Sequence, residues 1–268
     1  MGDHDYDRAV ATGGRLYVGT SGFAYKEWVG PFYPPGTKSA GMLPYYAGEF
    51  KSVEVNYTFR RTPSASTMEG WAAQTPDGFV FACKANQGIT HFARLVEADV
   101  RVKHFLEAVA PLGERLGPVL FQCPPNLRYD GAVLDAFLAR LPATGAAGRA
   151  HRYAMEFRHP SFDSDEVRAK LAEYGVAWCV ADTEESPAQF VRTAPDFAYL
   201  RLRRNGYSQE EISGWAGPIS QALAEGVDVY AYLKHEDSAA GPRDAAALRA
   251  LSAGHEGGAT SGSRPHRP

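Results

Sequence analysis

Hydrophobic and polar positions alternate in eight short runs rich in β-branched and aromatic residues, which we predict to be strands. Longer segments with apolar residues every three or four positions separate them, a spacing typical of amphipathic helices. Eight such strands favour a single (β/α)8 barrel of the TIM type, in the α/β class, because five or six suffice for a doubly wound sheet. The predicted strands are Leu16–Gly22, Ser52–Thr58, Phe79–Ala85, Pro118–Cys123, Arg152–Arg158, Ala177–Thr183, Phe197–Arg203 and Val227–His235.

Several helices are marked by their end residues. The apolar spacing in Asp99–Leu116 predicts one continuous helix there. Asp, Ser and Pro residues suit the first positions of helices, and Gly suits their ends. On this basis helices begin at Asp130, at Ser164 or Asp165 (ending at Gly175) and at a capping box of Ser208 and Glu211. Pro242 fits the first turn of a last helix that runs through Leu251.

The length of the chain agrees with one barrel. An α/β barrel uses about 250 residues, and the predicted elements of this 268-residue chain fill residues 15–251. Residues 1–14 and 252–268 carry too little apolar surface for its burial to offset the conformational entropy lost on ordering. We therefore predict one barrel domain between two disordered tails.

Composition limits the partners and the compartment. Lys and Arg number 28 against 31 Asp and Glu, so the formal charge of −3 predicts no overall basic field for nucleic acid or anionic membranes. We find no apolar run of about 18 residues and no signal-peptide core, so we predict no membrane partner. Cys83, Cys123 and Cys179 are an odd number without metal-ligand spacing. We expect them to be reduced core residues of a cytoplasmic protein.

The inward positions of the strands end in polar residues. Barrel strands alternate between side chains that face the helices and side chains that face the axis, and catalytic groups lie at the carboxyl ends. Placing Val53 and Val55 against the helices turns Glu54 and Asn56 inward. The same rule predicts inward polar or charged ends on seven consecutive strands. They are Glu54 and Asn56, Lys84, Gln122, Glu156 and Arg158, Asp182, Arg201 and Arg203, and Lys234.

The predicted charges favour an anionic ligand. Converging charges carry a desolvation cost that a simple scaffold has no reason to bear. The cations outnumber the carboxylates at the carboxyl end of the barrel, which we call the mouth. A phosphate or carboxylate is therefore the natural partner of the mouth. The alternative is a closed ion-pair network without chemistry, for example Arg158 with Asp182 and Arg201 with Glu54. The cations are Lys84, Arg158, Arg201, Arg203 and Lys234, and the carboxylates are Glu54, Glu156 and Asp182.

A series of motifs runs in order through these segments. It includes Gly19-Thr20-Ser21-Gly22-Phe23, Val53-Glu54-Val55-Asn56, Phe81-Ala82-Cys83-Lys84-Ala85, Glu156-Phe157-Arg158-His159-Pro160-Ser161 and Tyr199-Leu200-Arg201. With them the chain resembles the DUF72 (YecE-like) family from about Leu16 to about Leu251. The resemblance implies a TIM-like barrel and a family of unassigned activity. Only by analogy of fold, to metal-dependent endonucleases of the endonuclease IV type, does it suggest phosphoesters or nucleic acid.

The chain departs from the family pattern at three positions. Phe23 and Phe162 stand where the family commonly has Trp, which conserves packing. Arg203 stands where the family often has His after the Arg-Leu pair of the seventh strand. A guanidinium stays protonated, so Arg203 cannot replace a histidine that moves protons or binds metal.

Each candidate catalytic residue has two interpretations. Glu54 and Glu156 form an acid and base pair, or each neutralises an arginine. Lys84 forms a Schiff base, or more simply contacts a phosphate or carboxylate. His91, in a loop after the third strand, is a general acid or base, or a surface residue.

The metal and first-loop assignments are also open. A metal would require several of Glu54, His91, Glu156, Asp182 and His235 to converge, and no HxH or HExxH motif supports it. A catalytic divalent metal is therefore not favoured, and the cofactor is unknown. Thr20 lies in a two-glycine turn that suits an anion, and Tyr25 belongs to an aromatic cluster that stacks on a ligand or packs the core.

These observations predict an enzyme for a small anionic or phosphorylated substrate, with phosphoester hydrolysis, in nucleic acid or elsewhere, as the leading reaction. Arg158, Arg201 and Lys84 would hold the anion while Glu54 or Glu156 moves the proton. One alternative is a lyase or aldolase using Lys84 on a small carboxylated or phosphorylated metabolite. The other is a non-catalytic protein that binds a metabolite or single-stranded nucleic acid. The sequence does not indicate the oligomeric state.

Overall fold

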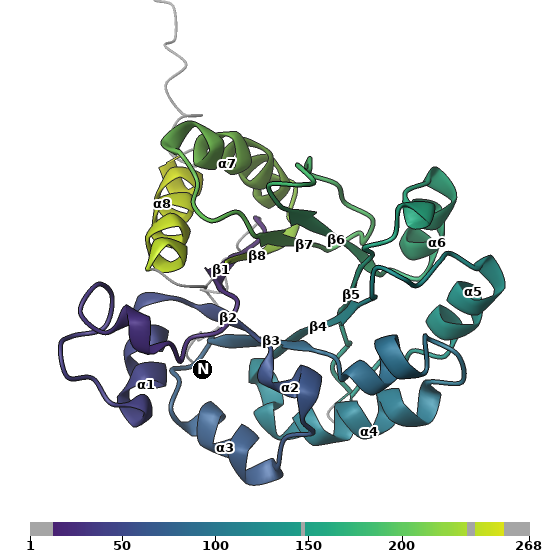
Figure 1. Cartoon of the computed structure of the whole chain (residues 1–268), viewed down its shortest axis with the longest axis horizontal. Helices are drawn as coiled ribbons and strands as arrows, with labels where there is room; N and C mark the ends of the chain where they lie inside the picture. Colours follow the sequence, from purple (N-terminus) through teal and green to yellow (C-terminus); the bar gives the residue numbers. More distant parts are fainter. Residues whose placement is uncertain (1–12, 146–147, 235–238, 255–268) are drawn as a thin grey trace, which may run out of the picture.

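Eight parallel strands form the wall of a barrel (Figure 1). The computed structural model describes residues 13–145, 148–234 and 239–254. From β2 onward each strand pairs with the next along the chain, and β8 pairs with β1. The predicted TIM-type barrel is confirmed. Its strands are β1 (Leu16–Thr20), β2 (Ser52–Val55), β3 (Val80–Lys84), β4 (Leu116–Gln122), β5 (Tyr153–Glu156), β6 (Ala177–Asp182), β7 (Phe197–Leu202) and β8 (Asp228–Leu233).

Helices surround the barrel except after β6, where residues 183–196 reach β7 without a helix (Figure 1). The α-helices are α1 (Ser39–Glu49), α2 (Tyr57–Arg60), α3 (Ala65–Ala73), α4 (Asp99–Val109), α5 (Gly131–Ala139), α6 (Asp165–Glu173), α7 (Gln209–Ala224) and α8 (Ala240–Gly254). Shorter elements are the 3-10 helices η1 (Lys26–Trp28), η3 (Ala110–Arg115) and η4 (Pro160–Phe162), and the π-helix η2 (Gly88–Phe92). No helix in the described ranges is both long and apolar enough to cross a membrane.

The predicted helix starts are confirmed at their caps. The side chains of Asp130 and Ser164 each accept a hydrogen bond from the backbone N–H three residues later. Ser208 and Glu211 form the complete capping box at the start of α7. These local hydrogen bonds satisfy donors that the first turn of a helix leaves unpaired.

One helix boundary was wrong. The segment predicted as a single helix over Asp99–Leu116 leaves the α-helical path after Val109, and Leu116 already belongs to β4. Gly113 in η3 has a φ of +58°, a conformation that glycine adopts readily. Apolar periodicity did not reveal this break.

The last helix has Pro242 in its first turn, as predicted, and it continues past Leu251. It runs to Gly254, and Ser252 within it is buried. The boundary predicted at residue 252 therefore falls inside α8. Most of the two predicted tails, residues 1–12 and 255–268, lies outside the described residues, so their disorder stays a prediction.

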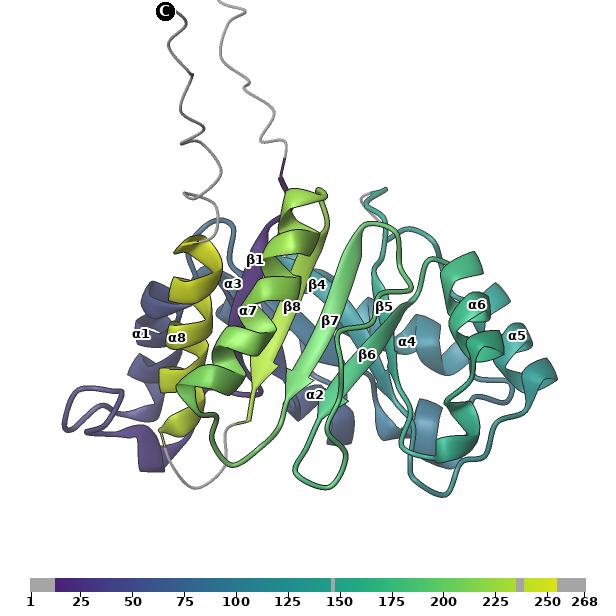
Figure 2. The same cartoon turned by 90° about the horizontal axis from the view of Figure 1, so that it is seen from above.

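Aromatic residues fill the barrel interior below the charged end. The rings of Tyr17 and Tyr230 stack with centroids 4.6 Å apart, and Tyr199 and Tyr232 lie 5.4 Å apart. Figure 2 shows the strand arrows running toward the end of the barrel where α2 lies. These aromatic rings occupy the barrel axis on the amino-terminal side of that end. Inward polar side chains therefore gather at the carboxyl ends of the strands.

The seam between β1 and β2 depends on a glycine. A backbone bridge joins Ser21 to Glu54 and completes the ring of strands. A Cβ atom on Gly19 would lie 2.0 Å from the carbonyl oxygen of Ser52 and 2.6 Å from the hydroxyl of Tyr46. The two strands approach this closely only because residue 19 has no side chain.

We expect Gly19→Ala to destabilise the protein by about 2–4 kcal/mol, because the seam must open to admit a methyl group. Urea unfolding at pH 7 measures this loss. Gly48→Ala is the matched control, since Gly48 lies exposed in α1 and a methyl group there would have no neighbour within 4 Å. It should raise stability by up to about 1 kcal/mol. Equal effects of the two substitutions would contradict the close approach.

Candidate active site

A buried arginine bridges two buried glutamates at the carboxyl end of the barrel. Arg201 of β7 donates from Nη2 to Oε1 of Glu54 at 2.8 Å and from Nη1 to Oε2 of Glu156 at 2.5 Å. Its Nε also donates to Glu54, at 3.2 Å. The three side chains are at most 2% exposed. Every nitrogen of Arg201 therefore donates to a glutamate.

Glu54 is also held by neutral groups. The hydroxyl of Ser21 donates to Oε1 at 2.8 Å, and the hydroxyl of Tyr199 donates to Oε2 at 2.8 Å. Burial raises the pKa of Glu54, but the charge and hydrogen bonds of Arg201 and the hydroxyl of Ser21 lower it below its usual value. Glu54 is an ionised carboxylate with both oxygens occupied.

Glu156 is ionised for the same reason. Burial raises its pKa, while the charges of Arg201 and Arg158 and their hydrogen bonds bring the pKa down to about 2. A carboxylate with so low a pKa is a weak base at neutral pH. The contacts of both glutamates therefore favour ion pairing over the acid and base roles predicted from sequence.

Lys84 is buried without a carboxylate partner among the described residues. Its Nζ atom donates to Oε1 of Gln122 at 2.6 Å and lies 4.0 Å from the ring centroid of Phe59. Only 8% of the residue is exposed. Burial and the positive charge of Arg201 lower its pKa to about 8, although the charges of Glu54 and Glu156 act in the opposite direction. Near pH 8 the amine is half neutral and able to act as a nucleophile.

Arg158 offers an accessible cation beside this amine. It follows β5, and its Nε donates to Oε1 of Glu156 at 2.9 Å. Its side chain is 43% exposed. This contact is its one ion pair in the part of the chain that the structure describes, and it leaves the two terminal nitrogens for a ligand. A guanidinium edge of this kind matches a carboxylate or phosphate.

His91 lies near both cations. It belongs to the π-helix η2, its Nδ1 is 2.8 Å from the hydroxyl of Thr90, and its ring meets the ring of Phe59 at a centroid distance of 5.0 Å. Burial and the charges of Lys84 and Arg158 lower its pKa. The imidazole is therefore neutral at neutral pH, which suits a group that accepts a proton.

Asp182 does not face the axis, so that prediction was wrong. In β6 it is Ala177 and Cys179 that pack with the interior residues, while Val180 belongs to the cluster under the helices. The alternation of inward and outward side chains was ambiguous in β6 because Cys179 and Val180 are both small and apolar. The bulky ring of the adjacent Trp178, which packs outside with Phe157, is the better indicator of facing.

The carboxylate of Asp182 serves another network. It accepts hydrogen bonds from Tyr207 at 2.8 Å, from Arg204 at 2.9 Å and from the backbone N–H of Ala188 at 2.9 Å. The predicted pair of Arg158 with Asp182 is wrong, since Arg158 pairs with Glu156. The predicted pair of Arg201 with Glu54 is confirmed.

The remaining predicted residues lie around this centre. Thr20 is buried in the seam, where its backbone N–H donates to the hydroxyl of Tyr46 at 2.8 Å, and Tyr25 donates to the carbonyl of Ser21 at 3.0 Å. Asn56 leads into α2. Lys234 donates to Asn205 at 2.6 Å, and the charge of the half-buried Arg203 helps to lower the pKa of Glu54.

Among the described residues, the candidate metal ligands do not gather at one point. No group of three or more His, Cys, Asp and Glu residues suited to a metal occurs in the described ranges. His235 lies outside the described residues. All three cysteines are free and buried, which confirms them as core residues.

Sequence reasoning missed several partners. Ser21, Tyr199 and Phe59 surround the charged groups, but none was assigned a contact with them. Tyr199 lies on the same inward row of β7 as Arg201, which is the one signal that pointed to it. The contact of Phe59 with Lys84 depends on how α2 crosses β3, where the hydroxyl of Thr58 bonds the carbonyl of Lys84 at 2.7 Å.

Arg201→Met should lower stability at pH 7 by about 3–5 kcal/mol, because it leaves the buried Glu54 without its paired cation and leaves Glu156 with Arg158 alone. Urea unfolding measures the loss, and Arg158→Met, at a half-exposed side chain, should cost less than about 1 kcal/mol. In the wild-type protein the contribution of Glu156 is fully present above about pH 4.5 and is lost as the pH falls toward about 2. Equal losses for the two variants would contradict the assignment of Arg201 as the central ion.

Comparison with known proteins supports one family throughout. The family described as "Protein of unknown function DUF72" matches residues 17–267. The UPF0759 protein YunF of Bacillus subtilis (strain 168) is 31% identical over 116 residues, which span 41% of this chain and 40% of that protein. A solved DUF72 family protein from Thermotoga maritima MSB8 is 25% identical with a TM-score of 0.76, covering 88% of this chain and 98% of that one. Another, from Enterococcus faecalis V583, is 16% identical with a TM-score of 0.71, covering 89% and 95%. A TIM-type barrel that carries the family pattern over most of its length, this chain belongs to the DUF72 family.

Proposed function

We propose that the barrel mouth is the active site of an enzyme that acts on a small anionic carbonyl compound through the amine of Lys84. The observation that carries this proposal is the pairing at the mouth. Both glutamates are occupied by arginines, whereas Lys84 is buried against Gln122 and Phe59 with a pKa of about 8. A network built only for stability would place a carboxylate beside a buried ammonium.

The same residues suggest how the reaction proceeds. Arg158 holds the carboxylate or phosphate of the substrate with its terminal nitrogens, which brings the carbonyl carbon to Lys84. The neutral amine adds to that carbon, and one of its protons passes to the carbonyl oxygen to give a carbinolamine. A proton from solvent then lets the hydroxyl group leave as water, which yields a protonated imine. This cation withdraws electrons from the neighbouring carbon and assists cleavage of a bond there. Water then restores the amine and releases the product.

His91 and Arg201 have different roles in this scheme. His91 is neutral and close enough for its pKa to respond to Lys84 and Arg158, so it is our candidate for moving protons. Arg201 acts as a positioning residue, because it fixes Glu156, which in turn orients Arg158. This differs from the role first predicted for Arg201, that of a direct ligand for the anion.

Phosphoester hydrolysis is the second candidate, since Lys84 and Arg158 also suit a phosphoryl group. The saturated glutamates support it less well, because neither is free to activate water. His91 would then be the base. A phosphate that binds at Arg158 while no carbonyl compound reacts at Lys84 would favour hydrolysis over the proposal.

The first test is reductive trapping of Lys84. Glyoxylate, the probe, combines an aldehyde with a carboxylate, and cyanoborohydride converts its imine to a stable adduct that peptide mass spectrometry locates. We expect Lys84 to react at least about tenfold faster than the exposed Lys51 at pH 8, with a midpoint for Lys84 near pH 8, because burial and the charge of Arg201 lower the pKa of Lys84 to about 8.

Formaldehyde and Arg158→Gln provide the controls. The charge of Arg158 helps to lower the pKa of Lys84, so the variant should slow labelling by both probes. It should slow glyoxylate far more, because formaldehyde has no charge for Arg158 to bind. Labelling of Lys84 no faster than that of Lys51 with both probes would refute the nucleophile. Equal slowing of both probes in the variant would refute the anion contact.

The second test is the stability of Lys84→Met. A shift in pKa from 10.5 to about 8 corresponds to at most about 3 kcal/mol of unfavourable free energy in the folded state below pH 8. The variant should therefore be more stable than the wild-type protein by about 1–3 kcal/mol at pH 7. The difference should shrink as the pH rises from about 8 to 10.5, because the wild-type amine becomes neutral in both states. A less stable variant in urea unfolding at pH 7 would show that Lys84 has a structural role.

A further inference from the structure

A cavity of about 870 Å³ lies at the amino-terminal end of the barrel. This is the end at which the strand arrows begin, opposite the mouth (Figure 2). Residues at or just before the starts of β1, β4, β5, β7 and β8 form much of its wall. Its volume falls in the range of ligand pockets, about 300–1,000 Å³. We call it the amino-terminal cavity.

Two tyrosines separate the amino-terminal cavity from the mouth. Phe197 and Tyr230, which line the cavity, are followed two positions later on the inward rows of β7 and β8 by Tyr199 and Tyr232. Arg201 comes two positions further along β7. The cavity therefore lies apart from the charged residues of the mouth, at the other end of the same strands.

Aromatic rings line the cavity on the side of the barrel interior. The ring of Tyr17 stacks on that of Tyr230, with centroids 4.6 Å apart and an interplanar angle of 6°, and Phe197 meets Tyr230 edge-on at 6.0 Å. Tyr230 covers one face of Tyr17, yet Tyr17 is only half-buried where it lines the cavity. It therefore leaves ring surface on which a planar ligand can stack.

Two carboxylates of the cavity wall are already occupied. Arg152 pairs with Asp196 at 2.9 Å and with Asp228 at 2.6 Å. The other oxygen of Asp228 accepts a hydrogen bond from the backbone N–H of Arg15 at 2.8 Å. This closed network contributes to the wall and leaves other charged groups to meet a ligand.

Two arginines at the rim of the cavity have no carboxylate partner. Arg15 and Arg149 are exposed, and neither makes an ion pair with any described residue. Arg149 donates from one nitrogen to the backbone carbonyl of Glu114. Glu114 supplies the one lining carboxylate without an ion pair in the described part of the chain. The unpaired charges are thus two cations and one anion, which favours an anionic group in the ligand.

Neutral polar groups complete the wall. The hydroxyl of Tyr17 makes no hydrogen bond with the described residues, whereas that of Tyr230 accepts one from Arg152 at 2.9 Å. His151 is neutral at pH 7, because burial and the charge of Arg149 lower its pKa. A phenol and a neutral imidazole can each donate or accept a hydrogen bond, which suits the polar edge of a heteroaromatic ring.

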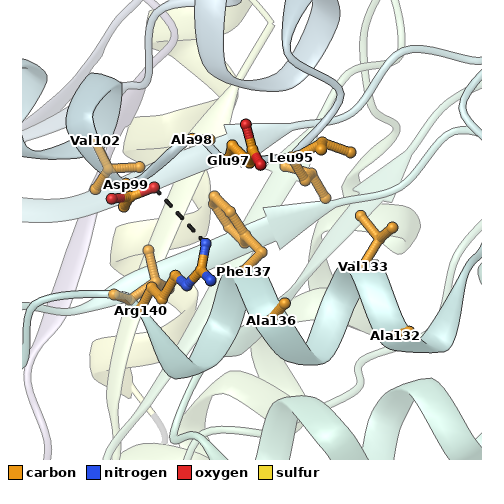
Figure 3. A pocket seen from close by; sticks show the side chains of 12 residues that line it. Leu95, Glu97, Ala98, Asp99, Val102, Ala132, Val133, Ala136, Phe137 and Arg140 are labelled. Carbon is orange, nitrogen blue, oxygen red and sulfur yellow. Dashed lines mark ion pairs between the residues drawn. The ribbon is translucent and has the colours of Figure 1, made fainter.

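The groove between α4 and α5 has a different chemistry (Figure 3). It measures about 270 Å³, and Val102, Val133 and Phe137 belong to its mainly apolar lining. Arg140, its one arginine among the described residues, faces Asp99 across it at 3.8 Å. The amino-terminal cavity is larger and combines aromatic rings with unpaired cations, so it is the better site for a charged aromatic ligand.

We propose that the amino-terminal cavity binds a planar aromatic compound that carries a phosphate or carboxylate group. The ring of the ligand stacks on Tyr17, and its anionic group contacts Arg15 and Arg149 at the rim. The hydroxyl of Tyr17 and the imidazole of His151 bond the polar edge of the ring. Catalytic groups of TIM-type barrels lie at the carboxyl end, so this site binds its ligand without transforming it.

The test is isothermal titration calorimetry of the full-length protein at pH 7 with adenosine monophosphate and indole-3-acetate. The first probe supplies a phosphate and the second a carboxylate, so the pair identifies the preferred anionic group. The controls are the separate halves of each probe, adenosine and ribose 5-phosphate for the first, indole and acetate for the second. We expect one probe or both to bind at least about tenfold more tightly than either half, because stacking and the anion contact both contribute.

Substitutions at the rim and at the mouth locate the bound probe. Arg15→Gln combined with Arg149→Gln should weaken binding of the anionic probe at least about tenfold and leave binding of its uncharged half unchanged. Tyr17→Leu should weaken binding of both, because it removes the stacking surface. Arg158→Gln is the matched control at the mouth and should leave all binding unchanged. Circular dichroism of each variant verifies that the barrel is folded.

Two results would overturn the proposal. One is the absence of saturable binding of both probes up to about 5 mM. The other is binding that the rim variant leaves unchanged, and its loss in Arg158→Gln would place the anion at the mouth instead. Neither result depends on whether Lys84 is a nucleophile, so this site and the proposed function fail separately.

Discussion

The arrangement of the barrel mouth depends on one ion, Arg201, held between two buried glutamates. It connects β7 to β2 through Glu54 and to the end of β5 through Glu156. Removing three charges from water is costly, and the cost is offset only because each nitrogen of the guanidinium donates to a carboxylate. The seam between β1 and β2 contributes as well. The backbone of Ser21 bridges to Glu54 and closes the ring of strands, and the hydroxyl of Ser21 donates a hydrogen bond to the carboxylate of Glu54.

This network determines which groups remain for chemistry. Two carboxylates near Lys84 would ordinarily stabilise its ammonium. Here both carboxylates instead accept hydrogen bonds from Arg201. Lys84 is left with a neutral amide and an aromatic ring, so its burial is not compensated and its pKa falls. A group that weakens the fold in exchange for reactivity is typical of a functional site. The proposed role of Lys84 is thus a consequence of the ion pairs around it.

The sequence was sufficient for the barrel and for most of its inward residues. Alternation with large outward residues, such as Val53 and Val55, identified Glu54 correctly, and it failed in β6 where Cys179 and Val180 are similar in size. The ion pairs could not be predicted from the sequence. The alternation along a strand tells which side chains face the axis, but it does not tell which carboxylate an inward cation contacts across the barrel. The burial of Lys84 likewise depends on α2, whose position over β3 is a property of the folded chain.

The most direct measurement of the central claim is an NMR titration of the side-chain amine of Lys84. Lysine labelled with 13C and 15N would report its protonation, with Lys84→Met used to assign the signal. The arrangement described here predicts a midpoint near pH 8, well below the value of about 10.4 for an unperturbed lysine side chain. A midpoint near 10.5 would show that the amine is an ordinary ammonium, and that the charged mouth is an ion-pair network without a nucleophile.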